Sequence, residues 1–228
     1  STGYLQNSTV ANSSVTASSV SGKTYAGGVT GLVQNAAVEG CAAISTDVRS
    51  VSVNEEANAA GVFAWAKNWW AVTKNVSDAT IHASGGKGSW TGGIGHPPSS
   101  KPSGSISMKE NYDVSENAGT DLVYRNASSY SGLTSGAALH LVSYGENAKT
   151  IAAGESFIAY PEITSADTII SVKSNDEKIA SVTTDESGVT VTGVSAGVAY
   201  ISVYATVGGT EYRLCSYPVT VENPAAQS

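Results

Sequence analysis

Apolar and polar residues alternate in short runs along the whole chain, and glycine interrupts these runs every few positions. At 51–53, Val51 and Val53 flank Ser52, so an extended backbone places both valines on one face and the serine on the other. Residues that favour helices are sparse. The pattern therefore predicts an all-β chain built from short strands.

The first half of the chain contains a repeated segment. The run Thr2-Gly3-Tyr4-Leu5-Gln6-Asn7 recurs as Thr30-Gly31-Leu32-Val33-Gln34-Asn35, an offset of 28 residues. A second landmark, Gly27-Gly28-Val29, returns as Ala60-Gly61-Val62 and again as Gly92-Gly93-Ile94, with offsets of 33 and 32 residues. Constant offsets over several positions indicate a structural repeat.

A unit of this length holds only two or three short strands and cannot bury an apolar face alone, so it must stack on its neighbours. Stacking predicts a parallel β-helix or a close relative, in which equivalent residues lie above one another. Asn7, Asn35 and Asn68 would then form a column at a bend, with side-chain amides bonded from coil to coil. The alternative is that these are ordinary asparagines in three loops.

The stretch from Gly27 to Asn35, followed by Val38-Glu39-Gly40-Cys41-Ala42, resembles the GLUG repeat of bacterial surface and adhesin-like proteins. That pattern is a glycine-rich apolar run followed by an apolar-x-Asn-Cys segment. Thr30 replaces a usual apolar residue, and Gly40 replaces the asparagine. The resemblance covers about residues 1–115 and implies a stacked-β stalk or display surface with no catalytic residues in the motif.

The stack is interrupted and then ends. The proline-rich segment 97–104 predicts a surface loop, and a strand pattern resumes at 105–108. From 115 to about 144 the pattern weakens, with a strand at 121–124 and a capping turn or short helix at 137–142. This stretch predicts the exit from the stack.

The second half has evenly spaced strands with turn signals every eight to twelve residues. The turn Val207-Gly208-Gly209-Thr210 predicts a two-residue hairpin, because both glycines accept positive φ. The pattern predicts an immunoglobulin-like β-sandwich at 146–228, after a stacked β repeat region at 1–145. The predicted strands are 149–152, 156–160, 168–173, 179–183, 189–192, 198–206 and 211–221.

This second half resembles the group 2 bacterial immunoglobulin-like domain over about residues 146–222. The resemblance lies in the segment 150–156, in Ser174-Asn175 ahead of 179–182, and in 188–193 with Gly197. Val172 stands where that family usually has a core tryptophan. The family implies surface-exposed, usually tandem modules that space out or present other domains.

Composition and charge narrow the setting. Lys and Arg total 12 against 19 Asp and Glu, a net charge of −7, so binding to nucleic acid is not expected. No apolar run is long enough to span a bilayer. An acidic chain rich in Ser, Thr, Gly and Ala suits an extracellular or bacterial cell-surface location. The absence of a starting Met predicts a longer parent chain with further domains.

Two cysteines, Cys41 and Cys215, lie far apart in the sequence. They are either two buried free thiols or, if their Cα atoms come within about 7 Å, a disulfide between the two domains. The low count excludes a small disulfide-rich fold.

No catalytic motif, metal site or cofactor is predicted, and we expect a non-enzyme. The three histidines, His82, His96 and His140, lack metal-ligand spacing. The alternative is a fragment of a polysaccharide-degrading β-helix enzyme, which needs clustered carboxylates and bases. The group available for it is Asp113, Glu116, Asp121 and Arg125.

All four tryptophans, Trp65, Trp69, Trp70 and Trp90, fall in the repeat half. Trp69 and Trp70 cannot both face the core of one strand, because neighbours alternate faces. Exposed tryptophans on a rigid sheet would bind a sugar or a protein, and the alternative is packing under a loop or against the second domain. We expect a protein of adhesion or display that binds a host or cell-wall glycan or protein, with a carbohydrate-binding module as the alternative.

Overall fold

The computed structural model describes residues 2–16, 18–95, 107–113, 115, 133–135, 148–160, 168–185 and 188–223. Their regular structure consists of strands, which confirms the all-β prediction. Within these ranges there is no helix of the length and apolar character needed to cross a membrane.

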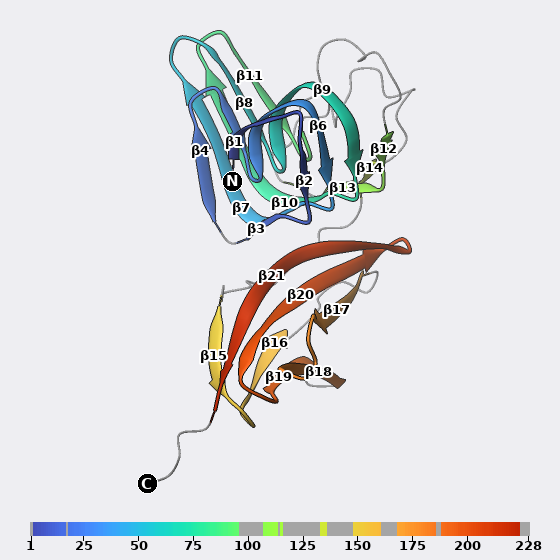
Figure 1. The fold of residues 1–228 in the computed structure, drawn as a ribbon. Helices are drawn as coiled ribbons and strands as arrows, with labels where there is room; N and C mark the ends of the chain where they lie inside the picture. The colour runs from blue at the N-terminus through green and yellow to red at the C-terminus, as the bar shows by residue number, and fades with distance from the viewer. Residues whose placement is uncertain are drawn as a thin grey trace.

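The first half forms three sheets whose strands pair in parallel (Figure 1). Sheet A contains β1 (Thr2–Gln6), β2 (Thr9–Ala11), β6 (Thr30–Glu39), β9 (Phe63–Thr73) and β12 (Ser107–Lys109). Sheet B contains β3 (Ser14–Thr16), β4 (Ser19–Gly22), β7 (Ala42–Ser52), β10 (Val76–Gly85), β13 (Asn111–Asp113) and β14 (Leu133–Ser135). Sheet C contains β5 (Tyr25–Gly27), β8 (Glu56–Ala60) and β11 (Gly88–Gly92).

The chain passes through sheets A, B and C in turn, and each passage pairs with the one before, so we call this part the coil region. Thr2 pairs with Thr30 and Tyr4 with Leu32, which is the 28-residue spacing found in the sequence. In Figure 1 the successive coils lie one behind another. Equivalent residues of neighbouring coils therefore stand side by side in the ladders.

Glycines let the coils approach closely where sheet C turns into sheet A. The amide of Gly28 donates to the carbonyl of Gly61 at 2.8 Å, and the amide of Gly61 donates to that of Gly93 at 2.7 Å. A Cβ on Gly61 would collide with the Gly93 carbonyl and the Ser77 hydroxyl. The spacings of 33 and 32 residues found in the sequence thus correspond to a column of tight bends.

The predicted asparagine column is only partly right. Asn7 and Asn35 occupy equivalent bends, both with positive φ (50° and 49°), and the Asn7 amide donates to the Gln34 carbonyl at 3.1 Å. Asn68 is paired with Gln34 and not with Asn35, because β9 carries irregularities in its register with β6. Asn68 therefore does not extend this column.

The side-chain amide ladder lies instead at the turn from sheet A to sheet B. Asn75 accepts from the Cys41 amide through Oδ1 at 2.9 Å and donates through Nδ2 to the Val38 carbonyl and to Asn111 Oδ1, both at 2.9 Å. Asn111 in turn donates to the Val72 carbonyl at 2.8 Å. Both asparagines are fully buried. The ladder ties consecutive coils together from within.

The second half is a sandwich of two sheets. One sheet contains β15 (Lys149–Ala152), β21 (Thr210–Glu222), β20 (Gly197–Val207) and β17 (Thr168–Ser174). The other contains β16 (Ser156–Tyr160), β19 (Gly188–Gly193) and β18 (Ala180–Asp185). The seven strands agree with the predicted ones to within two residues at each end. Gly208 and Gly209 form the predicted hairpin with φ of 56° and 81°.

Alternation along β20 fills the sandwich core as predicted. Ala199, Ile201 and Val203 are fully buried, whereas Tyr200 on the opposite face is 51% exposed. Val172, at the position where the resembling family has a tryptophan, is buried in the same cluster. Smaller apolar side chains therefore fill the core around it.

The sandwich packs against the outward face of sheet B, below the coil region in Figure 1. The rings of Tyr112 and Tyr212 lie 5.9 Å apart between centroids, and Arg213 Nη1 donates to the Asn12 carbonyl at 2.8 Å. Four side chains of sheet B join the apolar cluster of the sandwich: Ala42, Ile44, Val76 and Tyr112. The two units thus share one buried apolar cluster, which extends across their interface.

Several predicted features lie outside the described residues. These are the loop at 97–104, the strand at 121–124, the turn or helix at 137–142 and the predicted boundary at 145/146. The strand predicted at 105–108 corresponds to β12, which is described from Ser107.

Candidate functional site

A column of large side chains follows the outward face of sheet A. Tyr4, Leu32 and Trp65 occupy equivalent positions in β1, β6 and β9. Their chain neighbours Val33 and Ala66 point inward and are fully buried, so strand alternation turns this column outward. Tyr4 is 48% exposed, while Leu32 and Trp65 are partly buried.

A second column follows the outward face of sheet C. Tyr25, Asn58 and Trp90 are paired in register along β5, β8 and β11. The ring of Trp90 occupies the space that a Cβ on Gly92 would take, so the glycine lets the indole lie along the strand. Tyr25 is 38% exposed and Trp90 is partly buried.

The two columns meet where the outward faces of sheets A and C adjoin. The rings of Tyr25 and Trp65 contact each other with centroids 6.1 Å apart and planes tilted by 47°. This contact joins side chains from different sheets and fixes both rings. We call the surface formed by Tyr4, Leu32, Trp65, Tyr25 and Trp90 the aromatic corner.

A row of amides accompanies the corner on sheet A. Gln6 and Gln34 are paired in register, two residues along from Tyr4 and Leu32, and the backbone of Asn68 takes the next register position. The Tyr4 hydroxyl donates to Gln34 Oε1 at 2.7 Å, which orients that amide beside the ring. On sheet C, Asn58 is 3% exposed and donates to the Thr24 carbonyl at 3.4 Å, so its amide is part of the interior and not of the binding surface. Aromatic faces next to oriented amides are the groups that bind sugars, because they offer stacking and two-way hydrogen bonding.

The predicted tryptophans divide into two groups. Trp65 and Trp90 belong to the aromatic corner. Trp69 is paired with Ala36 through its backbone in β9, but the side chains of 68–70 lie outside the described ones. Sequence reasoning missed Tyr4 and Tyr25. The signal for Tyr4 was present, because the repeat placed this aromatic residue opposite Leu32 in an outward position.

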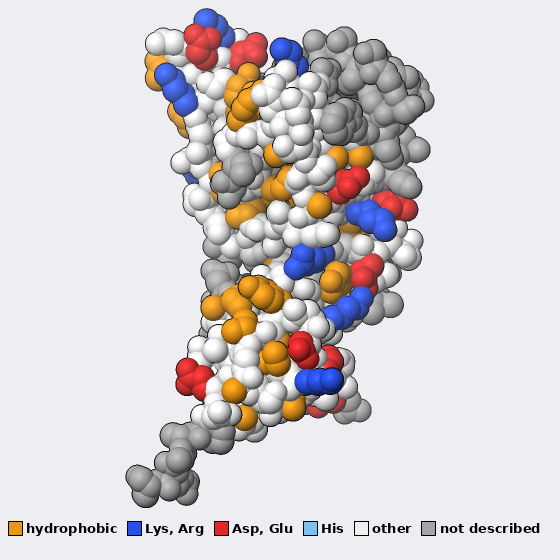
Figure 2. All heavy atoms as spheres, viewed as in Figure 1, with side chains coloured by type: hydrophobic (Ala, Val, Ile, Leu, Met, Phe, Trp, Pro, Cys, Tyr) orange, Lys and Arg blue, Asp and Glu red, His pale blue; other side chains and the backbone are white. Residues whose placement is uncertain are grey.

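Most charged side chains of the coil region lie in groups, and Lys67, which is exposed two residues beyond Trp65 in β9, is a charge next to the corner. On the face shown in Figure 2 they gather at one end of the coil region and toward the junction with the sandwich, with mostly uncharged surface between. Lys87 and Glu55 form an ion pair of 2.9 Å between β10–β11 and β7–β8. The five residues of the aromatic corner include no ionisable group other than the two tyrosines, and the Lys67 ammonium adjoins them on β9.

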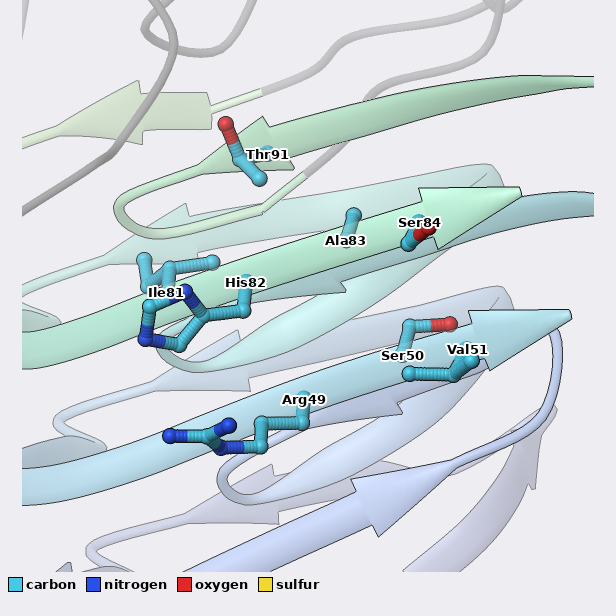
Figure 3. A pocket seen from close by; sticks show the side chains of 8 residues that line it. All are labelled: Arg49, Ser50, Val51, Ile81, His82, Ala83, Ser84 and Thr91. Atoms are coloured by element: carbon cyan, nitrogen blue, oxygen red, sulfur yellow. The ribbon is translucent and has the colours of Figure 1, made fainter.

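A hollow of about 460 Å³ lies over the ends of β7 and β10 (Figure 3). Arg49 and His82 project side by side at its edge, with Ser50, Ser84 and Thr91 also lining it. Arg49 Nε is already paired with the Asp47 carboxylate at 2.8 and 3.0 Å. Because that cation is paired, the hollow offers a mixture of hydroxyls and small apolar side chains around His82. Its described lining has no aromatic surface for stacking other than the imidazole, so the hollow is a weaker candidate than the corner.

Of the group considered for catalysis, Asp113 is the member that the structure describes. Asp113 is 6% exposed and sits inside the coil region, where its Oδ1 accepts from the Ser115 amide at 3.0 Å. Burial raises the pKa of this carboxyl, and hydrogen bonds from Ser115 lower it in part. Glu116, Asp121 and Arg125 lie outside the described residues.

The other reactive residues are separated from one another. His82 is exposed on β10, while His96 and His140 lie outside the described residues. Cys41 and Cys215 are free and buried, so the predicted alternative of a disulfide is wrong. Across the described residues, no three His, Cys, Asp or Glu side chains gather as a metal site would require.

A scan of the sequence against protein-family models finds no match, and a search among curated proteins finds none either. The resemblances to the GLUG repeat and to the group 2 bacterial immunoglobulin-like domain therefore stay predictions.

Proposed function

We propose that this chain is a non-catalytic glycan-binding protein of the bacterial cell surface that acts in adhesion or display. The observation that carries the proposal is the contact between Tyr25 and Trp65 at the meeting of two rigid sheets, beside the Tyr4–Gln34 hydrogen bond. Rings fixed before a ligand arrives lose little entropy on binding, which favours affinity. In this proposal the coil region presents the binding surface.

The sandwich acts as a spacer and presenting module in the same proposal. It is fixed to the side of the coil region by the Tyr112–Tyr212 contact and the Arg213–Asn12 hydrogen bond. A shared apolar cluster resists bending between the two units, since separating them would expose that apolar surface to water. Such an arrangement holds the aromatic corner at a fixed distance from whatever follows the sandwich.

A glycan array tests the proposal with the whole chain and with a Tyr25→Ala, Trp65→Ala double variant. We expect the wild type to bind a set of glycans and the double variant to lose them. New reducing ends are measured after the chain is incubated with the same glycans in solution, and none should form. Binding that survives the double variant, or release of sugar fragments, would contradict the proposal.

A further inference from the structure

We propose that the aromatic corner takes an extended, neutral chain of β-1,4-linked pyranoses that runs parallel to the axis of the coil region. The inference rests on the proposed function, because it names the class of ligand for the same surface. It follows from the spacing of the aromatic positions, from the amides beside them and from the negative net charge of the chain.

The spacing is set by the stacking of coils. Tyr4 and Trp65 lie in one column with Leu32 between them, so they are two strands apart in sheet A. Neighbouring strands are separated by about 4.8 Å, which places the two aromatic positions about 10 Å apart. In an extended β-1,4-linked chain each ring is turned over relative to the next, and rings of the same orientation recur once per disaccharide at about this distance. One ring can therefore stack on Trp65 and the next of like orientation on Tyr4, with the intervening ring over Leu32.

The amides match the edges of such a chain. Gln6 and Gln34 follow Tyr4 and Leu32 on the same face, one per coil. An amide donates and accepts at once, as equatorial hydroxyl groups at a ring edge require. The hydrogen bond from the Tyr4 hydroxyl holds the Gln34 amide in place. The chain direction that satisfies these amides in succession is the coil axis.

The charge distribution selects a neutral polymer. The two columns and the amides of Gln6 and Gln34 carry no charge at neutral pH, and Lys67 beside Trp65 offers one cation against the carboxylate that every ring of a uronic acid polymer carries. The chain as a whole carries a net charge of −7, which repels a polyanion.

Sheet C closes the corner on its second side. Tyr25 and Trp90 stand on that wall, two strands apart in the same way as Tyr4 and Trp65. A narrow extended chain can contact both walls, whereas a coiled α-linked chain does not keep its rings in line with either column. The corner should therefore discriminate between linkages of the same sugar.

Calorimetric titration of the whole chain tests the inference with four probes: cellohexaose, chitohexaose, maltohexaose and hexagalacturonate. We expect one or both β-1,4-linked neutral hexasaccharides to bind at least tenfold more tightly than the other two, and more tightly than their own disaccharide. Trp65→Ala and Tyr4→Ala should each weaken that binding by about tenfold or more, in the range of a central aromatic contact. Tyr200→Ala, which removes an exposed tyrosine of the sandwich, is the matched control and should leave affinity unchanged.

The outcomes separate the two proposals. One result would be that maltohexaose, hexagalacturonate or the disaccharide binds as tightly as the β-1,4-linked neutral hexasaccharides and loses affinity in Trp65→Ala and Tyr4→Ala. That result overturns the inference and leaves the proposed function standing. The inference is also overturned if no probe binds, or if a probe binds and neither substitution weakens it. If the glycan array shows no binding either, the proposed function is overturned as well. Because Tyr4 is 48% exposed, Tyr4→Ala should fold even if Trp65→Ala does not. Trp65→Tyr keeps a stacking ring and should retain most of the affinity.

Discussion

Replacing Asn75 by alanine should destabilise the coil region strongly. The Asn75 side chain is fully buried and bonds to two other coils. Its Oδ1 accepts from the Cys41 amide, and its Nδ2 donates to the Val38 carbonyl and to Asn111 Oδ1, each at 2.9 Å. Alanine removes all three bonds and leaves the surrounding groups without water to replace them.

The magnitude follows from the groups that lose a partner. The Cys41 amide and the Val38 carbonyl are backbone groups inside the coil, and each unsatisfied buried group costs about 1–3 kcal/mol. The expected loss is therefore about 2–6 kcal/mol, against a total of about 5–15 kcal/mol for a typical folded chain. The variant should unfold at a much lower urea concentration, with an unchanged dependence on urea.

Urea unfolding followed by circular dichroism measures this loss. Asn54→Ala is the matched control, because Asn54 lies exposed in the turn between β7 and β8, and it should change stability by less than about 0.5 kcal/mol. Asn75→Asp keeps the acceptor for the Cys41 amide but places a buried carboxylate oxygen against the Val38 carbonyl and Asn111 Oδ1, so it should be less stable than Asn75→Ala at neutral pH. A loss for Asn75→Ala no larger than that of the control would refute the ladder as a source of stability.

Three further predictions concern the interior. Gly61→Ala should lower the thermal midpoint by several degrees, because its Cβ would collide with the neighbouring coil. Gly3→Ala is the control and should not lower the midpoint, because nothing lies within 4 Å of a Cβ there. Equal effects of the two substitutions would argue against close stacking. Burial raises the pKa of Cys41 and raises that of Cys215 to about 11. Both thiols should therefore resist iodoacetamide at pH 8 until urea unfolds the chain. Rapid labelling of the native protein would be inconsistent with this prediction. Burial raises the pKa of Asp113, so its contribution to stability is complete below the ordinary carboxyl pKa and is lost as pH rises through the raised value. Asp113→Asn should remove that loss of stability in urea titrations run across this pH range. A variant with the same pH profile as the wild type would count against the prediction.

The sandwich was predictable from sequence because its strands have one buried and one exposed face. In β20, Ala199 and Ile201 alternate with Tyr200, and the two glycines of the following turn fix the register of the hairpin. Each signal is local, so neighbouring residues suffice to locate the strand ends.

The junction between the two units was not predicted, because it depends on contacts distant in sequence. Its signal was the continuous apolar run Cys41-Ala42-Ala43-Ile44, which belongs to a strand buried on both faces. Ala43 faces the interior of the coil region, whereas Ala42 and Ile44 pack with the sandwich. Without a partner in view, such a run is indistinguishable from an ordinary core strand.

The site was partly predictable, for a related reason. Tryptophan content drew attention to Trp65 and Trp90, but a single sequence does not show which sheets adjoin, so Tyr25 could not be placed against Trp65. The asparagine column was assigned to Asn68 because a constant spacing was assumed. Irregular register between β6 and β9 breaks that spacing, and the ladder forms at Asn75 instead.

A crystal structure of the chain with a bound β-1,4-linked hexasaccharide would test the central claim most directly. The account predicts sugar density along the corner between sheets A and C, parallel to the coil axis, with pyranose rings over Trp65 and Tyr4. Density across the coils, density confined to the hollow beside Arg49 and His82, or a Tyr4 that does not share a column with Trp65 would contradict it.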